Sequence, residues 1–121
     1  MTFKAVQVRE EQGAYQCSVV DKDDFAQPGN GEVRVAVEYS SLNYKDALSA
    51  AGNKGVTRNY PHTPGIDAAG TVLASSSDNW KAGDRVIVTG YDLGMNTDGG
   101  LAEQIQVPLP WLRLPVGWSE L

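Results

Sequence analysis

Hydrophobic and polar residues alternate along several short segments of the chain, most clearly from residue 32 to residue 39. In this segment, EVRVAVEY, three valines and a tyrosine fall on one face, and all three charged residues fall on the other. A period of two is typical of a half-buried β-strand. Further short apolar runs, separated by glycine, proline and polar residues, predict additional strands at residues 3–8, 15–19, 70–74, 85–89, 102–107 and 111–114. The pattern therefore predicts a mainly β fold.

One segment has the periodicity of a helix. From residue 44 to residue 51, apolar side chains recur at i, i+3, i+4 and i+7 and form one stripe: Tyr44, Ala47, Leu48 and Ala51. Asn43 precedes this segment and suits the N-cap, where its side-chain oxygen accepts a free first-turn N–H. Gly52 follows and suits the left-handed residue just past the helix end. We therefore predict a short amphipathic helix over residues 44–51.

Composition narrows the class of protein. With 121 residues the chain is long enough for one domain with a single core. A net charge of −5, with lysine and arginine scattered singly, argues against a nucleic-acid partner. The single cysteine, Cys17, excludes an internal disulfide. The N-terminus lacks the apolar core of a signal peptide, and no apolar stretch is long enough to span a bilayer. A cytoplasmic protein without a membrane or nucleic-acid partner is expected.

The start of the predicted helix carries Asn43, Tyr44, Lys45 and Asp46 in succession. A structural account is available for most of them, because Tyr44 belongs to the apolar stripe and because Asn43 and Asp46 are residue types that a helix start prefers. The same side chains are also suited to hydrogen bonding and proton transfer in a site. Both interpretations remain open from the residues alone.

Three segments together resemble a known family: SSLNYKDALSAAG (40–52), YPHTPGIDAAGTV (60–72) and KAGDRVIVTGYDLGMNTDGGLAEQIQVP (81–108). In this order and spacing they resemble the N-terminal, GroES-like half of the medium-chain dehydrogenase/reductase superfamily. The match is nearest to its zinc-free quinone oxidoreductase group, of the acryloyl-CoA reductase type. The resemblance implies a partly open β-barrel with a few short helices.

The resemblance also implies a second domain. In full-length relatives a Rossmann domain that binds NADP follows, but this chain contains no G-x-G-x-x-G after a predicted strand. Residues 1–121 are therefore expected to be a GroES-like catalytic domain, truncated before the cofactor-binding domain. Ser119 and Glu120 resemble a helix start at the point where the sequence stops.

No metal is expected. Zinc-dependent members of the superfamily hold their catalytic zinc with a cysteine and a histidine at positions that correspond here to Asn43 and Ile66, which are a poor ligand and a non-ligand. The four-cysteine lobe that carries structural zinc in those relatives is missing. His62, the only imidazole, has no Cys or His neighbour at ligand spacing and is interpreted as a surface or packing residue.

The resemblance implies roles for the helix start. Tyr44 is the first candidate for catalysis, as a hydrogen-bond or proton donor that lies against the cofactor. Asn43 is a second catalytic and cofactor-binding candidate, through its amide N–H. Asp46 is a third catalytic candidate, which would orient Tyr44 or a water molecule.

Weaker substrate-binding candidates lie elsewhere. Arg58, with Lys45, could meet a phosphate of CoA or NADP, although a solvated surface role is the default for both. Asp67 could line the floor of a cleft, and Tyr91 follows a predicted strand at a position suited to a cleft. Three tryptophans are interpreted as packing residues: Trp80, Trp111 and Trp118.

The leading hypothesis is thus the catalytic-domain part of a zinc-independent, NADPH-dependent reductase. Its substrate would be the activated C=C of acryloyl-CoA, a similar enoyl thioester, or a quinone. The full-length protein would be a homodimer, and the 121-residue chain alone would be inactive. One alternative is a stand-alone GroES-like binding or interaction module without catalysis. Another is a half-enzyme that pairs with a separately encoded Rossmann chain.

Overall fold

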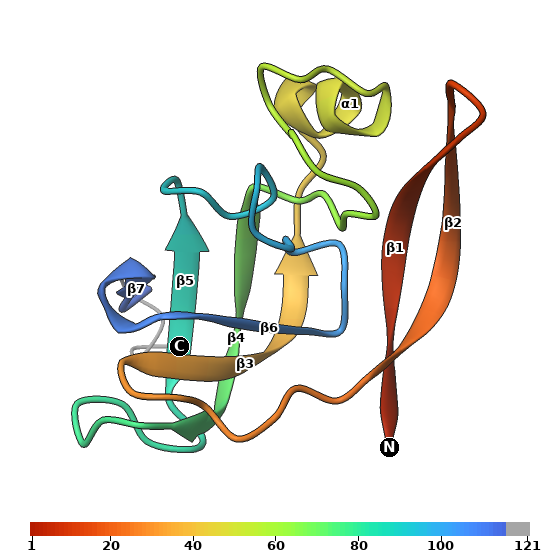
Figure 1. The fold of residues 1–121 in the computed structure, drawn as a ribbon. Helices are drawn as coiled ribbons and strands as arrows, with labels where there is room; N and C mark the ends of the chain where they lie inside the picture. The colour runs from red at the N-terminus through yellow and green to blue at the C-terminus, as the bar shows by residue number, and fades with distance from the viewer. Residues whose placement is uncertain (116–121) are drawn as a thin grey trace.

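Two antiparallel sheets form most of residues 1–115, the part of the chain that the computed structural model describes (Figure 1). The first is a hairpin of β1 (Thr2–Glu11) and β2 (Ala14–Asp23). The second has the order β6-β3-β4-β5-β7 and curls into a partly open barrel. Its strands are β3 (Glu32–Ser40), β4 (Asp67–Ser75), β5 (Arg85–Thr89), β6 (Gln104–Pro108) and β7 (Leu112–Arg113). The predicted mainly β fold is confirmed.

Each predicted strand is present, and the segment at 85–89 has the predicted bounds. β1 and β2 are longer than predicted, because their ladder continues without a break from Thr2↔Asp23 to Glu11↔Ala14. The turn that joins them is Gln12-Gly13, with φ of 53° and 80°. Positive φ at both central residues matches the right-handed twist of a hairpin. The turn therefore sets the register of the β1–β2 ladder, including the pairs formed by polar residues.

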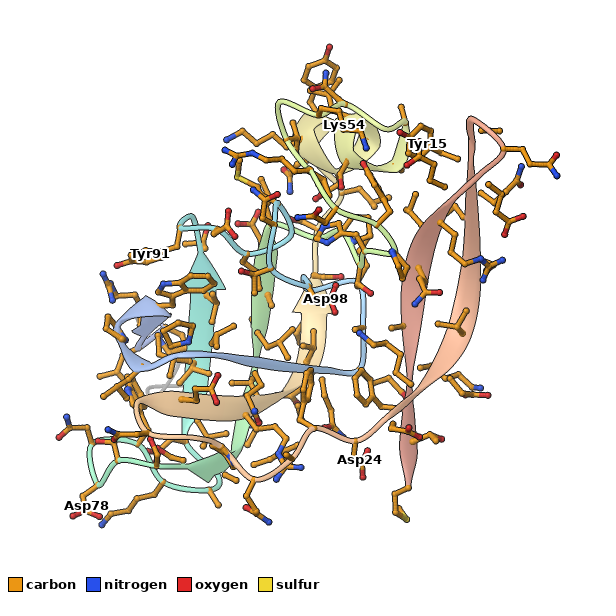
Figure 2. All side chains as sticks on the ribbon, viewed as in Figure 1. Tyr15, Asp24, Lys54, Asp78, Tyr91 and Asp98 are labelled. Atoms are coloured by element: carbon orange, nitrogen blue, oxygen red, sulfur yellow. The ribbon has the colours of Figure 1, made fainter. Side chains whose placement is uncertain are left out.

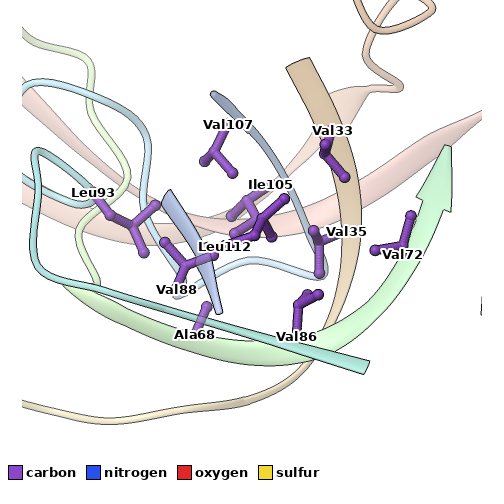
Figure 3. Packing of buried hydrophobic residues seen from close by; sticks show 10 residues of the cluster. All are labelled: Val33, Val35, Ala68, Val72, Val86, Val88, Leu93, Ile105, Val107 and Leu112. Carbon is purple, nitrogen blue, oxygen red and sulfur yellow. The ribbon is translucent and has the colours of Figure 1, made fainter. Parts of the chain in front are cut away.

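The core lies inside the curled sheet (Figure 3). Alternate residues of its strands point inward, which is why the valines of β3, β4, β5 and β6 meet there. The fully buried members include Val33, Val35, Val72, Val86, Val88, Leu93, Ile105 and Val107. Trp80 and Trp111 pack against this cluster as predicted, whereas Trp118 and the predicted helix start at 119–120 lie outside the described residues.

The far end of β3 leaves the predicted pattern. Val33 and Val35 are buried, but Tyr39 is 70% exposed. The ladder with β4 shifts register between Val37 and Tyr39, and an irregularity of this kind redirects the side chains that follow it. Beside it, a side chain at Gly70 would collide with the carbonyl oxygen of Ala36, so the two strands approach as closely as only glycine allows.

The helix forms where it is predicted, and α1 covers Tyr44–Ala50. Gly52 has φ of +89°, and the N–H groups of Gly52 and Asn53 bond to Ser49 and Leu48, which closes the helix as a Schellman motif. With α1 and the 3₁₀ turn η1 (Leu109–Trp111), the described residues hold only two helical segments.

The apolar stripe of the helix is not its buried face. Tyr44, at the head of the apolar stripe, is 78% exposed, whereas the fully buried side chains of α1 are polar: Asp46 at 4% and Ser49 at 0%. The physical reason is what the helix packs against. Ser49 Oγ lies 2.6 Å from Thr57 Oγ1 on the following loop, and Asp46 bonds to backbone N–H groups of another loop. The helix therefore buries the face that finds hydrogen-bond partners.

Candidate functional site

The candidate site lies at the end of the large sheet where strands β3 and β5 finish and strand β4 starts. The antiparallel order of these strands brings the ends together, with Asp67 paired to Thr89 in the β4–β5 ladder. A shallow groove of about 310 Å³ opens at this edge, and its lining includes Tyr39, Ser41 and Ile87 beside Asp67 and Thr89. The groove therefore combines apolar walls with a carboxylate.

Asp67 is the centre of a hydrogen-bond network built from side chains. Oδ2 accepts from the Ser41 hydroxyl at 2.9 Å and from the Asn43 amide at 3.1 Å. Oδ1 accepts from the Thr89 hydroxyl. The Thr89 hydrogen bond is the main cause that lowers the pKa of Asp67; burial opposes it, and the bonds from Ser41 and Asn43 support it. Asp67 is therefore a fixed negative charge at neutral pH.

Asn43 occupies the N-cap position, with an extended backbone. Its amide nitrogen donates to Ser41 Oγ at 2.9 Å as well as to Asp67 Oδ2. An amide has two N–H donors, so both are engaged within the protein. The amide of Asn43 therefore has no spare hydrogen for a cofactor or an oxyanion unless one of these bonds breaks.

Tyr44 is arranged differently. Within residues 1–115 its side chain has no hydrogen bond to another part of the protein, and it is 78% exposed. Leu42, two residues earlier, is 82% exposed, and Tyr39 at the end of β3 is 70% exposed. A large apolar surface next to a polar network is a typical property of a ligand or domain interface. The hydroxyl of Tyr44 is a free donor.

Asp46 points into the protein. Its Oδ1 accepts the N–H groups of Gly65 and Ile66, at 3.0 and 3.1 Å, and its Oδ2 accepts the N–H of Asn43 at 2.9 Å. These bonds tie the helix start to the loop before β4. The contacts describe a positioning residue for Asn43 and for the start of β4, and they place the Asp46 carboxylate away from the groove lining.

The weaker candidates are not brought together. Arg58 is exposed on the loop after α1, where its backbone N–H bonds to the Asn96 side chain. Lys45 is exposed on the helix. Neither belongs to the groove lining. Tyr91, two residues past Thr89, is 51% exposed and stacks on Trp111.

His62 is buried, at 3% exposure, so it is a packing residue rather than a surface residue. Its Nε2 lies 2.8 Å from the Gly94 carbonyl oxygen, and its Nδ1 lies 3.5 Å from Asp98. Asp98 (Figure 2) also accepts from Lys22 Nζ at 2.7 Å. Burial raises the pKa of Asp98, but the Lys22 ammonium, the Thr63 N–H and His62 together outweigh it and leave that pKa lowered. The cluster ties the hairpin to the barrel.

Among residues 1–115, no three His, Cys, Asp or Glu side chains gather in an arrangement that could hold a metal ion. Sequence reasoning missed Ser41 and Thr89, which complete the Asp67 network. Their only signal is position: each is a hydroxyl residue at or just past the end of a predicted strand. It also missed the Lys22–Asp98 pair, whose members are 76 residues apart.

Residues 29–114 match the alcohol dehydrogenase GroES-like domain. The chain therefore belongs to this family. It is 50% identical over 88 residues to the acrylyl-CoA reductase AcuI of Ruegeria pomeroyi, covering 72% of this chain and 27% of that protein. It is 39% identical over 80 residues to the chloroplastic quinone-oxidoreductase QR1 of Triphysaria versicolor, covering 63% of this chain and 23% of that protein.

The yhdH oxidoreductase of Salmonella enterica, solved in complex with NADP, has the same fold over 94% of this chain, with a TM-score of 0.84 and 42% identity. That match covers 35% of the Salmonella chain. The present chain thus spans about a third or less of the length of these relatives. No helix in the described part of the chain is long and apolar enough to cross a membrane.

Proposed function

We propose that this chain is the catalytic-domain part of a zinc-independent, NADPH-dependent reductase. The substrate is an activated C=C, as in acryloyl-CoA or a similar enoyl thioester, or else a quinone. The support from relatives is that the Ruegeria protein is named an acrylyl-CoA reductase and the Salmonella protein was solved with NADP. The support from this chain is the exposed Tyr44, which follows Asn43 of the Asp67 network in the chain, although neither Tyr44 nor Asn43 belongs to the groove lining.

The residues present suit a nicotinamide cofactor. When bound, NADPH supplies the hydride for conjugate addition. Tyr44 and Leu42 offer an exposed apolar surface of the kind that a planar ring covers, and Asn43 next to them is fixed by Ser41 and Asp67. Tyr44 is therefore the residue of this chain proposed to contact the nicotinamide end, and Asn43, whose amide hydrogens stay on Ser41 and Asp67, is proposed to position it.

The residues of this chain would have distinct tasks in the reaction. Addition to an enoyl thioester leaves enolate-like charge on the substrate oxygen, which needs a hydrogen-bond donor and then a proton at carbon. The amide of Asn43 is engaged, so the Tyr44 hydroxyl is the free donor of the pair. Asp67 orients Asn43 through a bond that stays in place while Asp67 is ionised. Asp46 positions the whole helix start.

The donor set of the groove supports zinc independence. The positions that carry zinc ligands in other members of the superfamily hold Asn43 and Ile66 here, and Ile66 offers no lone pair. Both carboxylate oxygens of Asp67 already accept from neighbouring side chains. A Tyr hydroxyl rather than a metal ion is thus the proposed electrophile.

Replacement of the Tyr44 hydroxyl tests this proposal. In the intact protein, Tyr44→Phe is expected to lower kcat with acryloyl-CoA by about 10²–10⁴-fold if Tyr44 transfers the proton. Steady-state kinetics with each substrate varied measure this, and the matched control is Tyr15→Phe on β2, whose hydroxyl bonds to Glu10 and whose ring packs near Gly52 at the other end of α1. A near-normal kcat with a raised KM for NADPH would leave Tyr44 with a binding role only.

The alternative of a stand-alone binding module has one attraction, which is that it needs no further domain. NADPH fluorescence titration distinguishes the two, with the 121-residue chain beside a version extended through the next domain. Binding by the extended form alone supports the reductase. Saturation of the short chain at micromolar NADPH would contradict the expectation that the following domain binds most of the cofactor. Pairing with a separate Rossmann chain would appear as binding only after that chain is added. The homodimer and the cytoplasmic location remain predictions.

A further inference from the structure

Three side chains form a rigid cluster beyond the end of β5. The rings of Tyr91 and Trp111 stack, with centroids 5.5 Å apart and planes 9° from parallel. Nη2 of Arg113, on β7, lies 2.5 Å from the Tyr91 hydroxyl. Nη1 of the same guanidinium donates to the Pro110 carbonyl at 2.7 Å and to the Leu112 carbonyl at 3.0 Å. Both the ring and the cation are therefore held in place.

The cluster presents this ring and this cation to solvent. Trp111 covers one face of Tyr91, yet Tyr91 is still 51% exposed, and Figure 2 shows its side chain directed away from the sheet. The backbone at Gly90 and Tyr91 has φ of 80° and 54°. A tyrosine rarely adopts a positive φ, and such a conformation persists only where the surrounding contacts enforce it.

The guanidinium of Arg113 is not neutralised by a carboxylate. Within residues 1–115 it forms no ion pair, and its partners are two carbonyl oxygens, the Tyr91 hydroxyl and the Tyr91 ring, whose centroid lies 5.7 Å from Cζ. In a chain with a net charge of −5, this is a fixed and exposed positive charge. A planar guanidinium held by its neighbours is well suited to a phosphate, because little side-chain entropy is lost on binding.

We propose that Tyr91, Trp111 and Arg113 form a subsite for a phosphorylated adenine nucleotide. The base stacks on Tyr91, which Trp111 supports from behind, and a phosphate bonds to Arg113. Stacking accepts any planar base, and the cation selects for the phosphate. A neutral quinone would use the ring alone and leave the charge without a partner.

The nucleotide belongs to the thioester substrate. Tyr91 lies two residues past Thr89, which bonds to Asp67 and lines the groove, so the Cα atoms of these two residues are no more than about 7 Å apart and the subsite adjoins the groove along the chain. CoA carries a thioester at one end of a flexible arm and an adenine nucleotide at the other. One molecule could thus occupy both the groove and the subsite. This assignment rests on the proposed function, while nucleotide binding itself can be measured without turnover.

Two nucleotide halves distinguish the possible sources. 3′,5′-ADP is the nucleotide half of CoA, and 2′,5′-ADP is the corresponding half of NADP. Calorimetric titration of the intact protein with each is expected to show that Arg113→Gln weakens 3′,5′-ADP about tenfold and leaves 2′,5′-ADP unchanged. Arg9→Gln, the same change at a partly exposed arginine of β1 that pairs with Glu11, is the matched control.

Two further variants separate the ring from the charge. Tyr91→Leu removes the stacking surface and is expected to weaken 3′,5′-ADP by a similar factor. Tyr91→Phe keeps the ring but frees Arg113 from the hydroxyl, so a smaller loss is expected. Thermal unfolding establishes that each variant is folded. The proposal is overturned if 3′,5′-ADP does not bind the intact protein, if these variants bind it normally, or if only 2′,5′-ADP is weakened.

Kinetics keep this proposal apart from the proposed function. With acryloyl-CoA, Arg113→Gln is expected to raise KM about tenfold and leave kcat unchanged, while acryloyl-pantetheine, which lacks the nucleotide, is unaffected. If the intact protein reduces neither thioester but still shows the Arg113 effect on 3′,5′-ADP, the reductase proposal fails and the subsite stands. If it reduces both and Arg113→Gln changes neither KM nor 3′,5′-ADP binding, the subsite alone fails.

Discussion

Asp46 and Asp67 lie 21 positions apart and each accepts three hydrogen bonds, but from different kinds of donor. Asp46 is buried and accepts only from backbone N–H groups, those of Asn43, Gly65 and Ile66. Asp67 borders a groove and accepts only from side chains, those of Ser41, Asn43 and Thr89. Backbone donors fix the course of the chain, whereas side-chain donors fix a charge where a ligand can approach it. Asp46 therefore fixes the backbone around the candidate site, whereas Asp67 places a negative charge in the groove itself.

The largest effect on stability is expected at the buried carboxylate. Asp46→Asn removes the charge and places an NH₂ group opposite backbone donors, so we expect a loss of about 3 kcal/mol in the free energy of unfolding. Urea denaturation of the intact protein measures it. Asp78→Asn, at an exposed loop residue, is the control and should change stability by less than about 0.5 kcal/mol. Equal effects at the two positions would mean that the three backbone bonds contribute little.

The effect of the partly buried carboxylate of Asp67 on stability should depend on pH. The pKa of Asp67 is lowered in the folded protein, so its contribution is fully present above the unfolded-state pKa, near 3.8, and is lost as the pH falls through the folded pKa. Asp98 has the same sign. Asp67→Asn is therefore expected to flatten part of the acid side of the stability curve, with a loss of about 1 kcal/mol at pH 7. An unchanged slope below pH 4 would contradict the assignment.

The smallest effect is expected from one donor to Asp67. Thr89→Val keeps the shape of the side chain and removes the hydroxyl that is the main cause of the lowered pKa. The pKa of Asp67 should rise toward its ordinary value, as measured by carboxyl NMR, while stability at pH 7 changes by less than about 1 kcal/mol. Thr71→Val, which removes a similar hydroxyl from Glu38, should leave the pKa of Asp67 unchanged.

The difference between Asp46 and Asp67 also marks the limit of prediction from sequence. Alternation between apolar and polar residues located the strands, because the core of the barrel is built from the inward valines of β3 to β6. The N-cap position of Asn43 and the closing Gly52 were equally visible, since the backbone hydrogen bonds that begin and end the helix join neighbouring residues. These are local rules, and the structure follows them.

The face of α1 could not be predicted in the same way. Apolar spacing placed Tyr44 inward, but burial of Asp46 depends on the N–H groups of Gly65 and Ile66, about 20 residues away. Likewise, nothing in the local sequence relates Thr89 to Asp67 before the β4–β5 ladder is known. Hydrogen bonds between segments distant in sequence determine both the burial of Asp46 and the contact of Thr89 with Asp67. The resemblance to a reductase family indicated Tyr44, which its hydrophobicity alone would have assigned to the core.

The hairpin described above has a practical consequence for handling the protein. Within residues 1–115, β2 pairs only with β1, so the other edge of β2 has no strand partner. One end of β2 carries the charged residues Asp21–Asp23, which discourage pairing with another strand. The stretch QCSVV at 16–20 carries no charge, and Val19 is 66% exposed. Unpaired strand edges without charged residues favour pairing of strands between molecules at high concentration. A lysine in place of Val19 would be the first substitution to introduce for crystallisation or concentrated storage.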